Sequence, residues 1–377
     1  MELSAKQLHI DKIEVLNLAG KERITIPFRN QVTFLTGING CGKSSLLNVL
    51  FDSLAIVPAV MQRPALSKFR FWASRVHFNN GECVDTLVMP NPNEKDKDLS
   101  DKVEAVTGKD FFDLKKIRAA QELYTATEED HTSTFISFDN NPEGEWWRKS
   151  FEEGAIKEFC EKRPLAFIYQ EDRQTLHNLD NYSIERSSFY WLNYSNSIDE
   201  RFAYCRSALQ VRESTLNKRV VKEIVKLQNE SESGFVSRLL ESNEYLKASS
   251  KLKEIENIYD KLNKYLVKSN KKIVKDEYDK ITLAIADDEN ETPISWHLLS
   301  RGEKTLMYLF LTTYYYKDRV AVFLLDEPEI ALHVDWQSDL IKDLVEIAPD
   351  NQFIIATHSP SLVMNGWIPN CLDLSKV

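Results

Sequence analysis

Four short apolar runs mark the buried strands that this sequence predicts. The runs cover residues 31–36, 165–169, 320–325 and 352–357. Mainly apolar runs of this length, of which residues 320–325 are apolar throughout, are typical of strands buried on both faces of a parallel sheet. Before the first run, residues 10–18 alternate in part, Gly20 and Lys21 form a turn signal, and residues 24–26 resemble a short strand. The pattern therefore predicts an α/β fold with a mixed or parallel sheet, flanking helices and an N-terminal β unit.

A different period governs residues 200–285, which we expect to form a helical insert. Apolar residues recur here every three, four or seven positions, and no proline occurs between Arg173 and Thr292. Residues 231–234 are a plausible turn, so two antiparallel helical arms would follow. The insert then resembles a short coiled coil, and an ordinary helical subdomain is the alternative.

Composition narrows the class of protein. The chain has 377 residues, is 42% hydrophobic and carries a net charge of −10, which disfavours an extended polyanion-binding surface. It has neither an apolar run of about 18 residues nor a signal-peptide core, so we expect a cytoplasmic protein without a membrane span. The 5 cysteines, without C-x-x-C spacing, argue against a disulfide framework or a zinc site.

Residues 37–44 fit the pattern G-x-x-x-x-G-K-[ST] between a predicted strand and a predicted helix. This context gives a phosphate-binding loop, in which backbone N–H groups and the helix N-terminus surround a phosphate. Lys43 would reach the β and γ oxygens, and Ser44 would ligate Mg²⁺. The predicted nucleotide-binding residues of the loop are Gly37, Asn39, Gly40, Gly42, Lys43, Ser44 and Ser45.

Three later motifs supply the rest of a hydrolytic site. The strand at 320–325 ends in Asp326, which would hold Mg²⁺ through water, and Glu327, which would polarise the attacking water. Ser300 and Gly302 stand before a helical run and can bind a γ-phosphate from a facing subunit. His358 follows the strand at 352–357, where a γ-phosphate contact is expected; a purely structural histidine is the alternative.

Together these motifs resemble an ABC-type ATPase head. The forms of residues 37–44, 300–303 and 326–333 are similar to the SMC/RecF/OLD side of that superfamily, especially the OLD-like and PtuA-like ATPases of phage defence. The resemblance covers residues 1–50 and 295–365. It implies ATP and Mg²⁺ as cofactors, a D-loop at 329–333 that crosses a dimer interface, and Gln170 as the Q-loop glutamine that binds the nucleotide and ligates its metal. Two departures are Arg301, at a position that is often small, and the lack of a Tyr or Trp before the loop to stack on adenine.

These motifs divide the chain into three expected segments. Residues 1–199 would form the N-terminal lobe of the head with the P-loop and Q-loop, and residues 200–290 the helical insert. Residues 291–377 would form the C-terminal lobe with four motifs: the signature at 300–303, Walker B with Asp326 and Glu327, the D-loop at 329–333 and the H-loop with His358.

The first functional hypothesis is an ATP-hydrolysing switch in which two heads enclose two nucleotides within a homodimer or higher homo-oligomer. Only 19 residues follow His358, too few for the C-terminal Toprim nuclease of OLD-type proteins, so we expect a separate effector protein, a nuclease. The alternative is a RecF-like DNA-repair ATPase that binds duplex through Lys268, Lys271, Lys272 and Lys275, although such runs usually form a solvated helix face. A transporter subunit is disfavoured by the missing aromatic residue.

Overall fold

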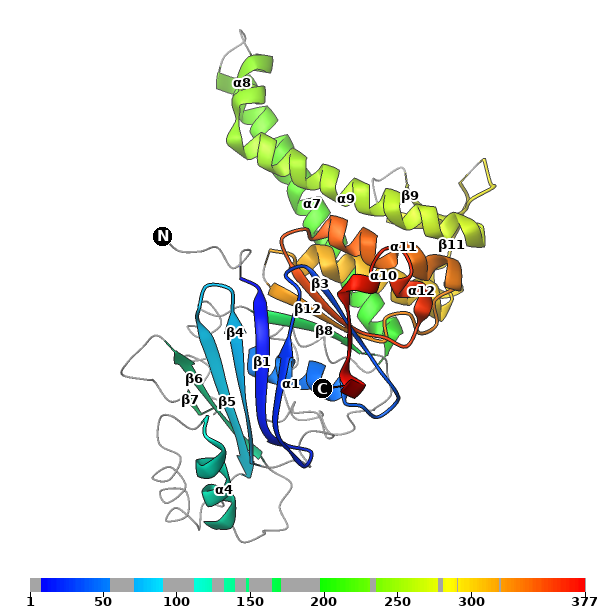
Figure 1. Cartoon of the computed structure of the whole chain (residues 1–377). Helices are drawn as coiled ribbons and strands as arrows, with labels where there is room; N and C mark the ends of the chain where they lie inside the picture. The colour runs from blue at the N-terminus through cyan, green and yellow to red at the C-terminus, as the bar shows by residue number, and fades with distance from the viewer. Residues whose placement is uncertain are drawn as a thin grey trace. The chain divides into compact units, whose positions relative to one another are not determined.

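The computed structural model describes residues 8–54, 71–90, 112–123, 132–139, 147–148, 165–170, 197–230, 235–276, 281–289, 291–318 and 320–376. The chain divides into two compact units (Figure 1). The first comprises residues 1–171, 316–328 and 349–377, and the second comprises residues 172–315 and 329–348. Within the described ranges, no helix combines the length and the apolar character that a membrane crossing requires.

A five-stranded, all-parallel sheet forms one layer of the first unit. Its strand order is β14-β3-β13-β12-β8. The strands are β3 (Val32–Thr36), β8 (Leu165–Gln170), β12 (Val320–Asp326), β13 (Gln352–Ala356) and β14 (Cys371–Asp373). All four apolar runs of the sequence form strands here, and β12 and β13 are buried along almost their whole length because the sheet has no solvent-facing side at its centre.

A six-stranded antiparallel sheet, in the order β2-β1-β4-β5-β6-β7, forms a second layer of this unit. Its strands are β1 (Ile10–Leu18), β2 (Lys21–Pro27), β4 (Trp72–Phe78), β5 (Cys83–Pro90), β6 (Thr132–Asp139) and β7 (Trp147–Arg148). The predicted hairpin at the N-terminus is confirmed as β1 and β2. Helix α4 (Leu114–Leu123) packs on one face of this sheet through Ile117 and Ala120.

Helix α1 (Lys43–Leu54) packs against both sheets of the first unit. Its side chains Leu47, Val49, Leu50 and Phe51 are fully buried. On the side of the antiparallel sheet, the Ser53 hydroxyl lies 2.8 Å from the hydroxyl of Ser74 on β4. Burial on both sides fixes the helix that carries the end of the P-loop.

The second unit contains the insert. Its elements are α7 (Ile198–Glu230), α8 (Phe235–Glu241), α9 (Asn243–Leu266), η5 (Val267–Ser269), η6 (Trp296–Leu298), α10 (Arg301–Tyr316) and α11 (Val334–Ile347). A three-stranded antiparallel sheet completes it, with β9 (Lys271–Lys275), β10 (Ile281–Ile285) and β11 (Pro293–Ile294). Helices α7 and α9 run side by side in opposite directions, as the two predicted arms do (Figure 1).

The expectation of a helix up to residue 285 was wrong at its end. Asn270 adopts a left-handed conformation with φ of 58°, which stops the helix, and residues 271–275 and 281–285 then form strands. The β-branched residues Ile273 and Val274 of β9, of which Ile273 is buried, suit a half-buried strand better than a helix. The first unit ends with α12 (Pro360–Val363), η7 (Ile368–Asn370) and η8 (Leu374–Lys376).

A buried glutamine ties the two sheets of the first unit together. The Gln352 side chain, on β13, is fully buried and accepts a hydrogen bond from Ile10 N–H at 2.8 Å. Its amide donates to the carbonyl oxygens of Ile10 and Arg29 at 2.9 and 2.8 Å. One side chain thereby provides hydrogen-bond partners for three backbone groups.

We predict that Gln352→Leu lowers the free energy of unfolding by about 3 kcal/mol, because buried backbone groups lose their partners. The matched control is Gln31→Leu, which removes an exposed amide that donates to Pro349 O at 3.3 Å and should cost less than about 0.5 kcal/mol. Denaturant unfolding measures both. Equal stability of the two variants would contradict the bridging role of Gln352.

Candidate functional site

The carboxyl ends of four parallel strands gather the predicted hydrolytic residues at one edge of the sheet. β3 leads into the P-loop, β12 ends in Asp326, and β13 precedes Thr357 and His358. In the strand register, Asp326 pairs with Gln170 on one side and with Ala356 on the other. Open α/β sheets bind ligands at this edge.

The P-loop surrounds the side chain of Lys43. Lys43 is 6% exposed, and its ammonium group donates to the carbonyl oxygens of Gly37 and Ile38 at 3.0 and 3.3 Å. Gly37 has a φ of 131°, and a Cβ there would lie 2.7 Å from Ser375 Oγ, so the loop needs glycine at this position. The Ser375 hydroxyl accepts a hydrogen bond from Ile38 N–H at 3.2 Å. Residues near the C-terminal η8 therefore shape the loop, a contribution that no sequence motif indicates.

Two hard oxygen donors meet next to the loop. The Ser44 hydroxyl donates to Asp326 Oδ1 at 3.0 Å. A hydroxyl and a carboxylate at this separation suit Mg²⁺, which prefers oxygen ligands and keeps several waters. Gln170 lies one strand away and donates through Nε2 to Asn48 Oδ1 at 2.9 Å. Sequence reasoning missed Asn48, a buried polar residue one helical turn after Ser44 on α1.

Glu327 and His358 lie close enough to act on the same group. Glu327 Oε1 is 3.8 Å from His358 Nε2, and the two side chains are 18% and 38% exposed. Glu327 has a φ of 50°, and its N–H donates to Ala356 O at 2.8 Å. A non-glycine residue in the left-handed region stores strain, which is common at active sites. The described residues contain no group of three or more His, Cys, Asp or Glu side chains that would hold a metal ion.

The predicted signature residues lie in the second unit, at the start of α10. Ser300 Oγ accepts a hydrogen bond from Glu303 N–H at 3.2 Å, and Glu303 Oε2 accepts one from Ser300 N–H at 2.6 Å. This reciprocal pair is a capping box. A Cβ on Gly302 would lie 2.2 Å from the carbonyl oxygen of Ala331, so the predicted D-loop packs directly on the signature glycine.

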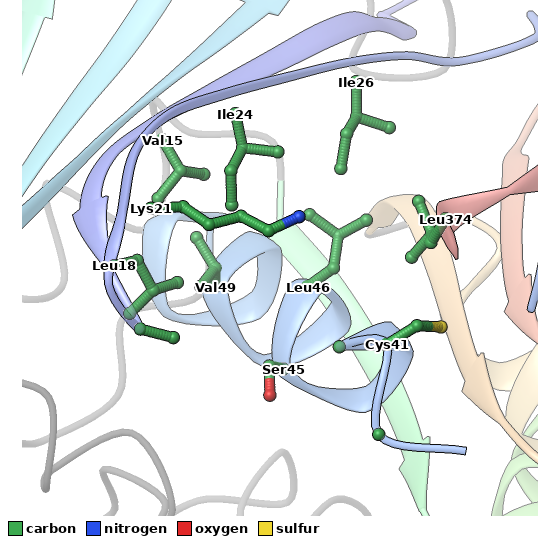
Figure 2. A pocket seen from close by; sticks show the side chains of 13 residues that line it. Val15, Leu18, Lys21, Ile24, Ile26, Cys41, Ser45, Leu46, Val49 and Leu374 are labelled. Carbon is green, nitrogen blue, oxygen red and sulfur yellow. The ribbon is translucent and has the colours of Figure 1, made fainter. Parts of the chain in front are cut away.

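An apolar pocket of about 310 Å³ opens beside the P-loop (Figure 2). Val15 and Ile24 of the β1–β2 hairpin, Leu46 and Val49 of α1, and Leu374 of η8 form its walls. Gly40, Cys41 and Gly42 contribute the P-loop side, and the Lys21 ammonium group extends across the pocket toward Leu46 in Figure 2. Aliphatic walls of this kind can hold a flat heterocycle without an aromatic stacking partner.

The lysines of the predicted DNA-binding patch do not form a solvated helix face. Lys271 pairs with Glu303 at 2.9 Å, Lys272 with Glu291 at 3.0 Å and Lys275 with Glu213 at 2.8 Å. All three lie on the strand β9, and only Lys268 precedes it, in η5. Most of the positive charge in this cluster is therefore compensated within the chain.

The structure thus brings Lys43, Ser44, Gln170, Asp326, Glu327 and His358 together within the first unit, with Asn39, Gly40, Gly42 and Ser45 in or next to the P-loop. Ser300 and Gly302 lie in the second unit. Their role requires a facing copy in the predicted mechanism.

A parallel sheet whose strand ends join a P-loop lysine, a loop serine and a strand-terminal Asp-Glu pair defines a P-loop ATPase. Residues 9–363 match the AAA ATPase domain family, AAA_15, and the chain belongs to that family. The protein is accordingly an ATPase.

Curated relatives agree with this assignment. The chain is 23% identical over 427 residues to the retron Ec83 probable ATPase of Escherichia coli, covering 96% of this chain and 71% of the relative. It is 23% identical to the retron Vc95 probable ATPase of Vibrio cholerae serotype O1 biovar El Tor, covering 87% and 66%. Over 76 residues it is 34% identical to endonuclease GajA of Bacillus cereus (strain VD045), covering 20% and 13%. These relatives confirm the resemblance to OLD-like ATPases.

Among solved structures, an Smc head bound to the C-terminal winged-helix domain of ScpA matches with a TM-score of 0.44 and 15% identity, over 95% of this chain and 92% of that chain. A second Smc head, with an extended coiled coil, bound to the C-terminal domain of ScpA from Pyrococcus furiosus, matches with a TM-score of 0.42.

Proposed function

We propose that the protein is a nucleotide-dependent dimeric switch that controls a separate effector in anti-phage defence. The observation that supports it most is the split of the catalytic set, with the hydrolytic residues in one unit and the capped signature serine in the other. The relatives named as retron ATPases and as an endonuclease supply the defence context.

Within one copy, the P-loop and Walker B residues bind and orient the substrate. Lys43 exchanges its contacts with loop carbonyls for the phosphate oxygens. Ser44, and Asp326 through water, would hold Mg²⁺, which would neutralise phosphate charge. Glu327 polarises the attacking water, and His358 contacts the γ-phosphate beside it.

A second copy completes the site. The N-terminus of α10 offers backbone N–H groups and the Ser300 hydroxyl, which together favour an anion. Two copies arranged head to head would then bind two nucleotides, and hydrolysis would open them. The D-loop at 329–333 packs on Gly302 and would face the same interface.

The apolar pocket beside the P-loop fits the base of the nucleotide. It adjoins the loop that holds the phosphates, and its walls are Val15, Ile24, Leu46, Val49 and Leu374. Burial of one face of a base against aliphatic side chains replaces the aromatic stacking that the sequence lacks.

The effector would be a nuclease on another chain. Its docking surface would be the insert of residues 200–290, which separates the two head lobes, 1–199 and 291–377, in the sequence. We place this assembly in the cytoplasm. A RecF-like ATPase that binds DNA directly is the weaker candidate, because Lys271, Lys272 and Lys275 are engaged in ion pairs. Salt-dependent duplex binding by the isolated protein would favour it.

Three variants test the composite site. Lys43→Ala should lose nucleotide binding, since the loop loses the charge that neutralises phosphate. Glu327→Gln should bind ATP, accumulate as a dimer and hydrolyse it about a hundredfold more slowly, because the general base is gone. Ser300→Arg should bind ATP as a monomer without turnover.

Mixing Lys43→Ala with Ser300→Arg separates hydrolysis across a dimer from hydrolysis within one copy. A mixed dimer has one site with both changes and one intact site, so part of the ATPase activity should return. No recovery at any mixing ratio, measured by phosphate release, would argue against a composite site. Unchanged ATP affinity in Lys43→Ala would overturn the P-loop assignment itself.

Ile24→Trp tests the base pocket. The indole should fill the pocket and weaken ATP binding about tenfold, while binding of inorganic tripolyphosphate, which has no base, stays unchanged. Thr25→Trp is the matched control, since successive strand residues point to opposite faces. Calorimetry gives both affinities. Equal weakening of ATP and tripolyphosphate would mean that the P-loop is distorted, and unchanged ATP affinity would place the base elsewhere.

The protein alone should not cut nucleic acid. The described residues contain no group of three or more His, Cys, Asp or Glu side chains that could hold a metal ion for such cleavage. We therefore expect plasmid DNA, RNA and tRNA to stay intact with the purified protein, Mg²⁺ and ATP. Gel assays check this. Cleavage that survives repeated purification and disappears in Glu327→Gln would place the effector activity in this chain.

A further inference from the structure

Glu303 is a buried carboxylate that joins the signature serine to η5 and β9, in the C-terminal part of the insert. Its side chain is 1% exposed. Lys271 Nζ lies 3.0 and 2.9 Å from its two oxygens, and Ser300 N–H donates to Oε2 at 2.6 Å. The hydroxyl of Ser269 donates to Oε1. Each oxygen therefore accepts two hydrogen bonds, Oε1 from Ser269 and Lys271 and Oε2 from Ser300 and Lys271.

This arrangement sets the direction of the Ser300 hydroxyl. Ser300 Oγ accepts a hydrogen bond from Glu303 N–H, so its own proton is left for an acceptor beyond the helix end. Ser300 is exposed, and it lies where a helix N-terminus attracts anions. A hydroxyl held in this way is ready to donate to a phosphate oxygen.

The charge of Glu303 needs a partner at this place. Burial by itself would raise the pKa of Glu303, but hydrogen bonds from Ser269, Lys271 and Ser300 outweigh it and hold the pKa below its ordinary value. The group is thus a carboxylate at neutral pH. Without the ammonium group of Lys271, the buried Glu303 carboxylate would have no compensating charge. It would then lie uncompensated at the N-terminus of α10, where the γ-phosphate is proposed to bind.

Strand β9 carries Lys271 and is fixed to both helices of the insert. Asn263 of α9 donates to Ile273 O at 3.0 Å and accepts from Ile273 N–H at 2.7 Å. Lys275 pairs with Glu213 of α7, whose side chain is 5% exposed. A displacement of the insert helices would therefore move Lys271 relative to Glu303.

We infer that Lys271 is a positioning residue for ATP hydrolysis: it holds Glu303 so that Ser300 presents its hydroxyl to a γ-phosphate, and it connects that geometry to the helical insert. The inference rests on the proposed function only in that Ser300 acts on nucleotide bound by a facing copy. The stabilisation of the capping box by Lys271 does not depend on whether Ser300 binds a nucleotide.

The test compares Lys271→Met with Lys272→Met, a matched control that removes the neighbouring lysine and its pair with the half-exposed Glu291. Lys271→Met should lower kcat about tenfold with little change in KM, because the bound nucleotide is unaffected while the facing serine is misplaced. Hydrogen exchange of the Ser300 and Glu303 amides, measured without nucleotide, should accelerate in Lys271→Met alone.

A double variant, Lys271→Met with Glu303→Gln, separates charge compensation from loss of folding. Glutamine keeps the acceptor for Ser300 N–H but carries no charge, so kcat and amide protection should return to the values of Glu303→Gln alone. Wild-type exchange and turnover in Lys271→Met, or no rescue in the double variant, would overturn the inference. A third outcome is fast amide exchange in Lys271→Met, rescue in the double variant and full ATPase activity in Ser300→Arg. This outcome would support the role of Lys271 in stabilising the capping box and would refute the composite site.

Discussion

Parallel hydrogen bonding between β3, β13, β12 and β8 is the constraint on which the candidate site depends. Strands that run in one direction end at one edge, so the residues that follow them meet there whatever their distance in sequence. Ser44 and Asp326 are 282 residues apart and share a hydrogen bond. The register of β12 against both neighbours then places Gln170 and Ala356 level with Asp326. A shift of one residue in the β3–β13 pair or in the β13–β12 pair would separate the loop serine from the carboxylate that faces it.

The parts of the site that could be predicted from sequence are those whose signal is local. Apolar runs identify strands that are buried on both faces, and the P-loop and the Asp326-Glu327 pair occupy fixed positions next to such runs. Neither the strand order nor the separate antiparallel sheet follows from these signals, because pairing depends on contacts distant in sequence. Asn48 illustrates the limit, since its contact with Gln170 spans 122 residues and leaves no pattern in either segment.

Residues 271–275 show why a local signal can mislead. Lys-Lys-Ile-Val-Lys continues the composition of the helices before it, and a single left-handed residue, Asn270, changes the outcome. The side chains of Lys271 and Lys275 then bind carboxylates on α10 and α7. Lysine spacing alone cannot distinguish a solvated basic face from internal ion pairs, because the partners Glu303 and Glu213 lie in segments that the spacing does not include.

Gly302 and Glu303 fix the signature segment in two different ways, Gly302 by close packing against the D-loop and Glu303 by hydrogen bonds and an ion pair. The glycine is required because Ala331 O approaches to within 2.2 Å of where a Cβ would stand, and Ala331 itself has a φ of 67°. The glutamate is required because it closes the capping box and receives Lys271. The start of α10 is thus held by the D-loop through backbone packing and by Lys271 of β9 through an ion pair. Packing against the D-loop resists displacement over short distances. Lys271, in contrast, moves with β9, which hydrogen bonds and an ion pair fix to the helices of the insert. If the heads switch as proposed, a partner that binds the insert would act on the signature serine through Lys271 and Glu303. The D-loop, packed on Gly302, would keep that serine in place at the dimer interface.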